Sequence, residues 1–180
     1  MQRRVDLTAP RGLEWLRLWK LYLRAFPEDE RKPIRRILKM YRRGLAKIWA
    51  IRKDGKFSGL VMTVDSPRLV QLDYLAVCEK ERNSGLGSEA LKLLREMLGE
   101  RSLFAEIENA AQPGPDQALR QRRREFYLRA GMEPLGIRAE VYDVQMELLG
   151  WNCKLTFDEY LAFYRDYYRP QAAEHIRQMP

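Results

Sequence analysis

An arginine and two glycines stand at the start of a segment that has the pattern of a helix. Arg82 precedes Gly85 and Gly87, and leucines and an alanine follow them at helical spacing. The first turn of a helix leaves several backbone N–H groups unpaired and carries about half a positive charge. Glycines there let an anion approach the backbone closely, and an arginine adds a cation. Residues 82–88 therefore predict a site for a phosphate-bearing ligand.

Two other phosphate-binding patterns fit this segment less well. GLGSEA, residues 85–90, matches G-x-G-x-x-G/A, and Glu106 and Glu108 lie near the distance at which a dinucleotide site carries its ribose carboxylate. Such a site begins directly after a strand of a parallel unit, whereas CEKERNS intervenes here and hairpins precede it. A P-loop requires Lys and then Ser or Thr after its last glycine, but serine and glutamate follow Gly87. We therefore rank nicotinamide or flavin binding well behind a phosphate site at the start of the helix. We exclude nucleoside triphosphate hydrolysis.

Hydrophobic periodicity predicts the elements that position this segment. Helices are expected over residues 12–26, 34–43, 85–98, 120–132 and 156–169. Strands are expected over residues 3–7, 102–108, 137–144 and 145–151, with three more between residues 45 and 77, of which the third is 69–77. This order predicts a mixed sheet with helices packed against it.

Local signals add detail to the predicted helices. Gly131 is expected to cap the helix of residues 120–132, and Thr156 with Glu159 has capping-box spacing. The buried face of the helix at residues 85–98 is expected to comprise Leu86, Ala90, Leu94 and Met97. The residues of the last helix that face the domain are expected to be Phe157, Leu161 and Tyr164.

Composition bounds the class of protein. The 180 residues are 46% hydrophobic, enough for the core of a single domain over residues 1–180. No apolar run approaches the roughly 20 residues that cross a bilayer, and MQRRVDLTAPRG lacks the apolar centre of a secretory signal. We therefore expect a cytoplasmic protein that does not bind membranes. Cys78 and Cys153 form no C-x-x-C pair and His175 is the one histidine, so no metal is expected.

The charge of the chain favours anionic partners. The formal net charge is +8 and the pI is about 9.6, which suit nucleic acid, acidic surfaces or a polyphosphate cofactor, and also suit an ordinary basic surface. No recognised nucleic-acid motif occurs, so nucleic-acid binding stays a third-ranked hypothesis.

Four motifs in order resemble the GNAT superfamily of N-acetyltransferases. That family uses Q/R-x-x-G-x-G/A to cradle the pyrophosphate of acetyl-CoA, and Arg82, Gly85 and Gly87 match this frame. The family also has a strand ending in a Leu-Ala-Val-like triplet before the cradle, as in LAV at residues 75–77, and an acid-rich strand after the cradle helix, as in AEIEN. A Tyr-x-x-x-Gly motif then begins at Tyr127. Two departures are Met132, where the family usually has an aromatic, and a longer insertion after Asn109.

The resemblance implies a fold, a cosubstrate and a binding site. The expected fold is a GNAT-type mixed α/β (α+β) fold, with a mainly antiparallel sheet of about six to seven strands and helices on both faces. The cosubstrate is acetyl-CoA, without a metal. The residues expected to contact it are Leu75, Ala76, Val77, Arg82, Asn83, Ser84, Gly85, Leu86, Gly87, Ser88 and Asn109.

Acetyl transfer to an amine requires a base and an acid. Asp73 is the only acid of its strand, and alternation places it on one face with Gln71, Leu75 and Val77. It is the first candidate base, with pairing to an arginine as the alternative. Glu108 is nearer the carboxyl end of its strand than Glu106. It is the second candidate, as base or as anchor for a cationic acceptor, and the alternative is a plain surface carboxylate.

Tyr127 is the candidate acid. Its phenol has an ordinary pKa of roughly 10, close enough to a thiol at roughly 8.5 to protonate the departing sulfur. The alternative is a core aromatic, like Phe126. Cys78 is interpreted as a small packing residue that nothing activates. In this family the connection that corresponds to residues 26–33 borders the acceptor pocket. We interpret its acidic residues as an exposed loop or as charges that attract an amine.

These observations predict an N-acetyltransferase that moves an acetyl group from acetyl-CoA to a primary amine by direct attack. The acceptor is a small molecule or a peptide, and its identity is not readable from the sequence. The alternative is a non-catalytic acyl-CoA-binding or regulatory module that keeps the cradle without a base. The aromatic tail, residues 160–168, is interpreted as a packing surface or a homodimer contact.

Overall fold

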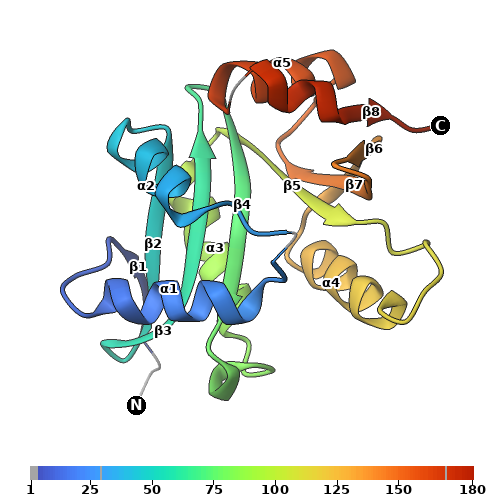
Figure 1. Ribbon diagram of the computed structural model, residues 1–180. Helices are drawn as coiled ribbons and strands as arrows, with labels where there is room; N and C mark the ends of the chain where they lie inside the picture. Colours follow the sequence, from blue (N-terminus) through green and yellow to red (C-terminus); the bar gives the residue numbers. More distant parts are fainter. Residues whose placement is uncertain (1–3, 29, 169) are drawn as a thin grey trace. The chain divides into compact units, whose positions relative to one another are not determined.

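The computed structural model describes residues 4–28, 30–168 and 170–180. In these ranges the chain forms five α-helices and eight mainly antiparallel strands, a mixed α/β fold (Figure 1). The chain falls into two compact units. The first unit is Met1–Asp65 with Leu72–Gly99, and the second unit is Ser66–Gln71 with Glu100–Pro180. A single domain over residues 1–180 stays a prediction.

The first unit is a layer of strands between helices. Its strands follow the order β1 (Val5–Thr8), β2 (Ala46–Lys53), β3 (Lys56–Asp65) and β4 (Leu69–Val77), whose first residues belong to the second unit. β1 and β3 both pair with β2 in antiparallel register. Helices α1 (Glu14–Ala25) and α2 (Ile34–Arg42) cover one face and α3 (Leu86–Leu98) the other (Figure 1). Between β4 and α3 lies a short 3-10 turn, Glu79–Glu81.

Hydrophobic spacing explains why these segments fold as they do. In α1, Leu18 and Tyr22 are four residues apart and fully buried, and they pack in one cluster with Ile48, Leu60 and Tyr74. The helix ends directly before Phe26 and Pro27, since the residue before a proline avoids helical backbone angles. The two predicted N-terminal helices are thus confirmed, with their ends shifted by one or two residues.

Strand β4 alternates between a buried and a half-buried face. Leu72, Tyr74 and Ala76 are buried, whereas Asp73, Leu75 and Val77 are half-buried on the opposite face. The predicted alternation is therefore confirmed. β3 lies very close to β4 at Gly59, where a Cβ atom would be 2.6 Å from the Ala76 carbonyl oxygen.

The second unit contains the remaining elements of the chain. They are β5 (Ser102–Glu108), α4 (Gln117–Arg129), β6 (Glu133–Val141), β7 (Val144–Trp151), α5 (Phe157–Tyr167), a 3-10 segment (Pro170–His175) and β8 (Ile176–Gln178). The strands follow the order β5, β7, β6, β8, and each neighbouring pair is antiparallel. The predicted capping box is confirmed, because Thr156 and Glu159 bond reciprocally at the start of α5.

Several predicted details are wrong. The predicted strand 137–144 crosses a tight turn at Tyr142 and Asp143, which adopt left-handed backbone angles (φ 48° and 66°) without a glycine to signal them. Met97 is 47% exposed, because the buried face of α3 runs through Leu91 and Leu98 instead. In α5 the prediction is confirmed for Tyr164, which is buried, but it missed the buried Tyr160 and Phe163, while Phe157 and Leu161 are half-buried.

The sequence gives no signal for β8, which is three residues long and follows a 3-10 segment. No helix within the described ranges is both long enough and apolar enough to cross a lipid bilayer.

Candidate functional site

The start of α3 presents unpaired backbone N–H groups. Its first helical hydrogen bond runs from the Glu89 N–H to the Gly85 carbonyl at 3.1 Å. The N–H groups of Leu86, Gly87 and Ser88 have no hydrogen-bond acceptor among the residues that the structure describes. Gly85 is the N-cap and contributes no side chain that would cap them. These three donors and the positive end of the helix suit an anion.

The loop before α3 leaves this helix start open to solvent. Asn83 and Gly85 adopt left-handed backbone angles (φ 62° and 82°), which asparagine tolerates and glycine adopts without strain. Arg82 is exposed, and its guanidinium makes no ion pair with any described residue. The nearby Glu81 carboxylate is bound by Lys53 at 2.8 Å. The three N–H donors, Gly85 and the exposed Arg82 guanidinium together fit the phosphate groups of a nucleotide-like ligand.

The end of β4 leads into this loop. Leu75 and Val77 lie on its half-buried face, and the Cys78 N–H donates to the Ser58 carbonyl at 2.8 Å. Burial raises the pKa of the Cys78 thiol, so the thiol stays neutral and unreactive near neutral pH. Cys78 is therefore a packing residue.

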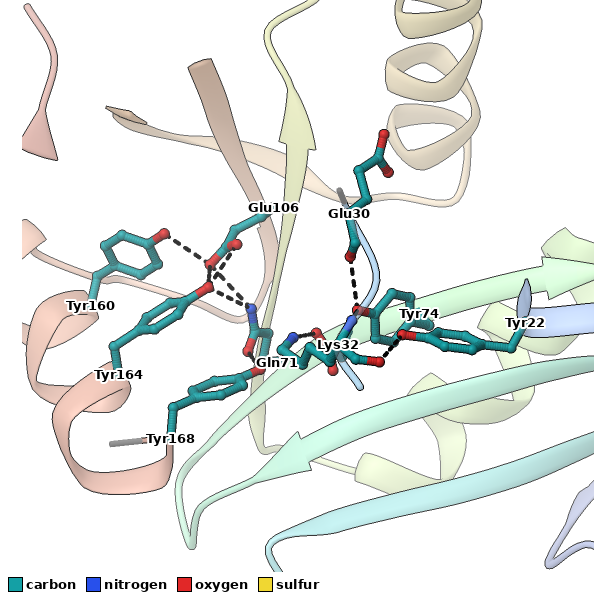
Figure 2. A network of polar contacts seen from close by, with 10 residues as sticks. Tyr22, Glu30, Lys32, Gln71, Tyr74, Glu106, Tyr160, Tyr164 and Tyr168 are labelled. Carbon is teal, nitrogen blue, oxygen red and sulfur yellow. Dashed lines mark hydrogen bonds and ion pairs between the residues drawn. The ribbon is translucent and has the colours of Figure 1, made fainter. Parts of the chain in front are cut away.

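Asp73, earlier on the same face of β4, is held by a lysine. Its side chain is 10% exposed, and the Lys32 ammonium forms an ion pair with its carboxylate. The same ammonium lies 5.2 Å from the centre of the Tyr74 ring (Figure 2). The sequence suggested an arginine as the alternative partner of Asp73. The lysine comes instead from the connection between α1 and α2.

Two buried tyrosines fix the backbone of that connection. The Lys32 N–H donates to the Tyr74 hydroxyl at 3.0 Å, and this hydroxyl donates to the Glu30 carbonyl at 3.0 Å. The Tyr22 hydroxyl donates to the Lys32 carbonyl at 2.9 Å. Burial raises the pKa of Tyr22 to about 12 and raises that of Tyr74 further, so both stay protonated donors. The acidic residues of this connection were interpreted as an exposed loop or as charges that attract an amine. Glu28 is exposed, and Asp29 lies outside the described residues.

Glu108, in the second unit, connects β5 to α4. Arg123 Nη1 lies 3.1 Å from one carboxylate oxygen, and Arg120 Nη1 lies 3.6 Å from the other. Arg120 is 9% exposed and also donates to the Gln112 carbonyl at 2.7 Å. One turn further along α4, Arg124 binds Glu147 through two hydrogen bonds of 2.9 and 3.1 Å. The arginines of α4 are thus partly structural.

Tyr127 lies near the end of α4. It is half-buried beside Phe126, and burial raises its pKa to about 12. Within the described part of the chain, its hydroxyl has no hydrogen-bond partner. Gly131 and Met132 end the helix, since the Met132 N–H donates to the Tyr127 carbonyl at 3.1 Å and Gly131 has a φ of 84°.

Asn109 closes a turn at the end of β5. Its Oδ1 accepts from the Ala111 N–H at 3.0 Å, and its own N–H donates to the Gln145 carbonyl at 2.9 Å. The structure thus gives Asn109 a structural role, and its contact with a cosubstrate stays a prediction.

The sequence predicted no specific role for the carboxylate of Glu106. Glu106 accepts hydrogen bonds from the hydroxyls of Tyr160 (2.8 Å) and Tyr164 (2.8 and 2.9 Å), and from Gln71 Nε2 at 3.1 Å (Figure 2). Tyr168 donates to the Gln71 side chain. The sequence feature that indicates this cluster is the four-residue spacing of the tyrosines, which places their rings on one side of α5.

A hollow of about 660 Å³ lies elsewhere in the first unit. Its lining residues are Arg4, Asp6, Thr8, Arg11, Leu13, Glu14, Arg17 and Arg52. Glu14 binds Arg52 there through hydrogen bonds of 2.8 and 2.7 Å, and none of the predicted site residues lines the hollow. We therefore interpret it as a structural ion-pair cluster.

The predicted site residues divide between the units. Asp73, residues 75–77 and residues 82–88 belong to the first unit, where one strand and its following loop bring them together. Glu108, Asn109 and Tyr127 belong to the second unit. Throughout the described ranges, no group of three or more His, Cys, Asp or Glu side chains is arranged to hold a metal ion.

Solved structures resemble this fold. A GNAT-family protein from Bacteroides thetaiotaomicron has 20% sequence identity and a TM-score of 0.73, with 92% of this chain and 98% of that chain covered. An acetyltransferase from Elizabethkingia anophelis with acetyl-CoA bound has 16% identity and a TM-score of 0.60 over 84% and 98% of the two chains. The ribosomal-protein-S18-alanine N-acetyltransferase from Escherichia coli has 14% identity and a TM-score of 0.58 over 85% and 96%.

The sequence itself matches a family. No curated protein matches it at a significant level. The acetyltransferase (GNAT) family matches residues 15–132 of the 180-residue chain, from α1 to the end of α4. This range contains β4, the open loop and the start of α3, where the unpaired N–H groups lie. The chain therefore belongs to the GNAT family of acetyltransferases.

Proposed function

We propose that the protein transfers an acetyl group from acetyl-CoA to the primary amine of a small molecule or a peptide. The observation that carries this proposal is the start of α3. Three unpaired N–H groups, a left-handed Gly85 and the exposed Arg82 meet there, inside the range that matches the family. They suit the pyrophosphate of coenzyme A. The acetyl-CoA bound to the neighbour from Elizabethkingia anophelis supports this choice of cosubstrate.

Acetyl-CoA supplies an activated acetyl thioester when it binds. Residues 82–88 would hold its phosphates, and the main chain at residues 75–77 would orient its pantetheine arm. Asn109 is an additional contact that we propose from the family resemblance. These residues act by binding and orientation, because backbone donors fixed by a helix and a strand need no rearrangement to receive the ligand.

The acceptor amine must lose a proton before it attacks. Its pKa is roughly 10, so at neutral pH it arrives as an ammonium group. We propose Asp73 as the first base and Glu108 as the second. Asp73 shares a strand face with Leu75 and Val77 in the unit that contains the cradle, whereas Glu108 is bound by two guanidinium groups. Lys32 also pairs with Asp73, so it is the shared strand face that favours Asp73.

The departing thiolate must gain a proton, and we propose Tyr127 as the donor. Its raised pKa keeps the phenol protonated, and its hydroxyl is not engaged by any described residue. A phenol with a pKa of about 12 is a weak acid for a thiolate, so the transfer requires contact with the sulfur in the complex.

A second candidate function is a non-catalytic module that binds acyl-CoA. The ion pairs of both candidate bases favour it, because a carboxylate held by Lys32 or by arginines can be purely structural. The two functions differ in turnover. We would incubate the protein with acetyl-CoA and a panel of diamines, amino acids and short peptides, and follow release of the coenzyme A thiol. An enzyme releases thiol with at least one amine and yields an acetylated product. A binding module binds acetyl-CoA and releases thiol with none.

A further inference from the structure

We propose that Asp73 and the Tyr74 ring form a binding site for a primary ammonium group, which Lys32 occupies in the free protein. The acceptor amine then takes the place of Lys32. This inference rests on the proposed function and specifies how its acceptor is held. It specifies the acceptor as an alkylamine that binds in its charged form, like the side chain of Lys32.

The contacts of Lys32 are those that recognise an alkylammonium group. Its charged nitrogen pairs with the Asp73 carboxylate. The same nitrogen lies 5.2 Å from the centre of the Tyr74 ring (Figure 2). A carboxylate next to an aromatic face provides a charge-assisted hydrogen bond and a cation–π contact. The Asp73 side chain is only 10% exposed, so water screens the pair weakly.

The position of this site on β4 suits an acceptor. Asp73 precedes Leu75 by two residues on the same face, which corresponds to about 7 Å along a strand. An amine bound by Asp73 would therefore lie next to the main chain proposed to orient the pantetheine arm. The carboxylate that binds the ammonium group is also the first candidate base, so binding and deprotonation use the same oxygen atoms.

Exchange of the Lys32 ammonium for an acceptor would leave the Lys32 backbone in place. The backbone of Lys32 is bound by the Tyr22 and Tyr74 hydroxyls, which are independent of its ammonium group. Replacing one ammonium by another leaves Asp73 paired throughout, so no buried carboxylate is left unpaired. Lys32 therefore competes with the acceptor, and its removal should strengthen amine binding.

The test uses n-butylammonium, which has the chain length and charge of a lysine side chain, in the absence of acetyl-CoA. Calorimetric titration of Lys32→Ala should show binding at least about tenfold tighter than that of the wild type, because the competing cation is gone. The double variant Lys32→Ala with Asp73→Asn should lose this binding. The neutral n-butanol should bind neither protein. Equal affinity of wild type and Lys32→Ala, or binding that survives Asp73→Asn, would overturn the proposal.

Lys47 provides a matched control. It pairs with Asp65 at 3.0 Å in the same unit, but its side chain is 44% exposed. Lys47→Ala should bind n-butylammonium no better than the wild type. If Lys32→Ala does not fold, NMR of the wild-type lysine ammonium groups decides the question. Saturating n-butylammonium should shift the Lys32 signal to that of a solvated lysine and leave Lys47 unchanged, and an unchanged Lys32 signal contradicts the proposal.

Failure of the proposed ammonium site can be distinguished from failure of the proposed function. The titration contains no acetyl-CoA, so a failed ammonium site alongside intact acetyl-CoA binding refutes only this inference. Amine binding without any acetyl-CoA binding refutes the acetyltransferase proposal and leaves the ammonium site in place.

Discussion

Tyr127 is the residue whose surroundings bear most directly on the proposed chemistry. Burial raises its pKa to about 12, so the phenol keeps its proton up to a pH near that value. We predict that Tyr127→Phe lowers kcat by roughly 10²- to 10⁴-fold, the usual contribution of a positioned acid. Between pH 7 and 10 the wild type should show no loss of kcat from ionisation of this phenol. Steady-state kinetics over pH measure both effects.

Tyr142→Phe is the matched control, because Tyr142 is 47% exposed in a turn of the same unit. It should retain the wild-type kcat. An unchanged kcat in Tyr127→Phe would exclude Tyr127 as the acid.

The two candidate bases give opposite predictions. Asp73→Asn keeps the shape of the side chain but removes its charge, and we expect kcat/KM for the acceptor to fall roughly 100-fold or more. Glu108→Gln should chiefly loosen its contacts with Arg120 and Arg123, with a loss of stability and a change in kcat/KM of less than about threefold. Kinetics and thermal unfolding of both variants separate these effects. The reverse ranking would assign the base to Glu108.

At the scale of residues, the sequence predicted the local features and missed the distant ones. The glycines at the start of α3 and the face of Asp73 follow from spacing over a few residues. The contact of Asp73 with Lys32 spans 41 positions, and that of Glu106 with Tyr160 spans 54. Such pairs depend on how the elements pack, which a pattern in one segment does not encode.

At the scale of elements, the capping box of α5 is the clearest local sequence feature that determines where a helix begins. The Thr156 hydroxyl accepts from the Glu159 N–H at 3.3 Å, and the Glu159 carboxylate accepts from the Thr156 N–H at 2.8 Å. We predict that Thr156→Ala lowers the free energy of unfolding of the second unit by about 0.5 to 2 kcal/mol. Thr156→Ser, which keeps the hydroxyl, should lose far less. Urea unfolding followed by circular dichroism measures this, and equal midpoints for Thr156→Ala and the wild type would contradict it.

Elements with explicit signals were predicted well, and those without were not. Gly131 and the capping box marked helix ends correctly. The hairpin between β6 and β7 turns through Tyr142 and Asp143, a pair without the glycine that usually marks such turns. In α5 periodicity identified the buried Tyr164 but not Tyr160 and Phe163.

At the scale of the whole molecule, stability should decline in alkali. The pKa of Tyr22 rises from about 10 in the unfolded chain to about 12 in the fold, where the side chain is fully buried. The folded state therefore binds more protons in this range, and its stabilisation is complete below pH 10 and lost as pH rises toward 12. We predict that the free energy of unfolding in urea falls from pH 10 upward. Tyr22→Phe should show a smaller decline, and equal slopes for the two proteins would contradict this assignment.

The overall class of the molecule was predictable because four short motifs occur in order along the chain. Residues 15–132 match the family, and the solved neighbours share the fold. A cytoplasmic location and a homodimer remain predictions, as does the choice of acceptor, because these depend on surfaces and partners that spacing along one chain does not specify.

The most direct test of the account is a calorimetric titration with acetyl-CoA of the wild type, Gly85→Val and Gly44→Val. Both glycines have left-handed backbone angles (φ 82° and 72°) with open space around them, so valine strains each turn in the same way. Only Gly85 lies at the start of α3, whereas Gly44 follows α2. We predict that the wild type and Gly44→Val bind acetyl-CoA alike and that Gly85→Val binds at least about tenfold more weakly. Absence of binding by the wild type, or equal binding by Gly85→Val, would contradict the cradle at the start of α3.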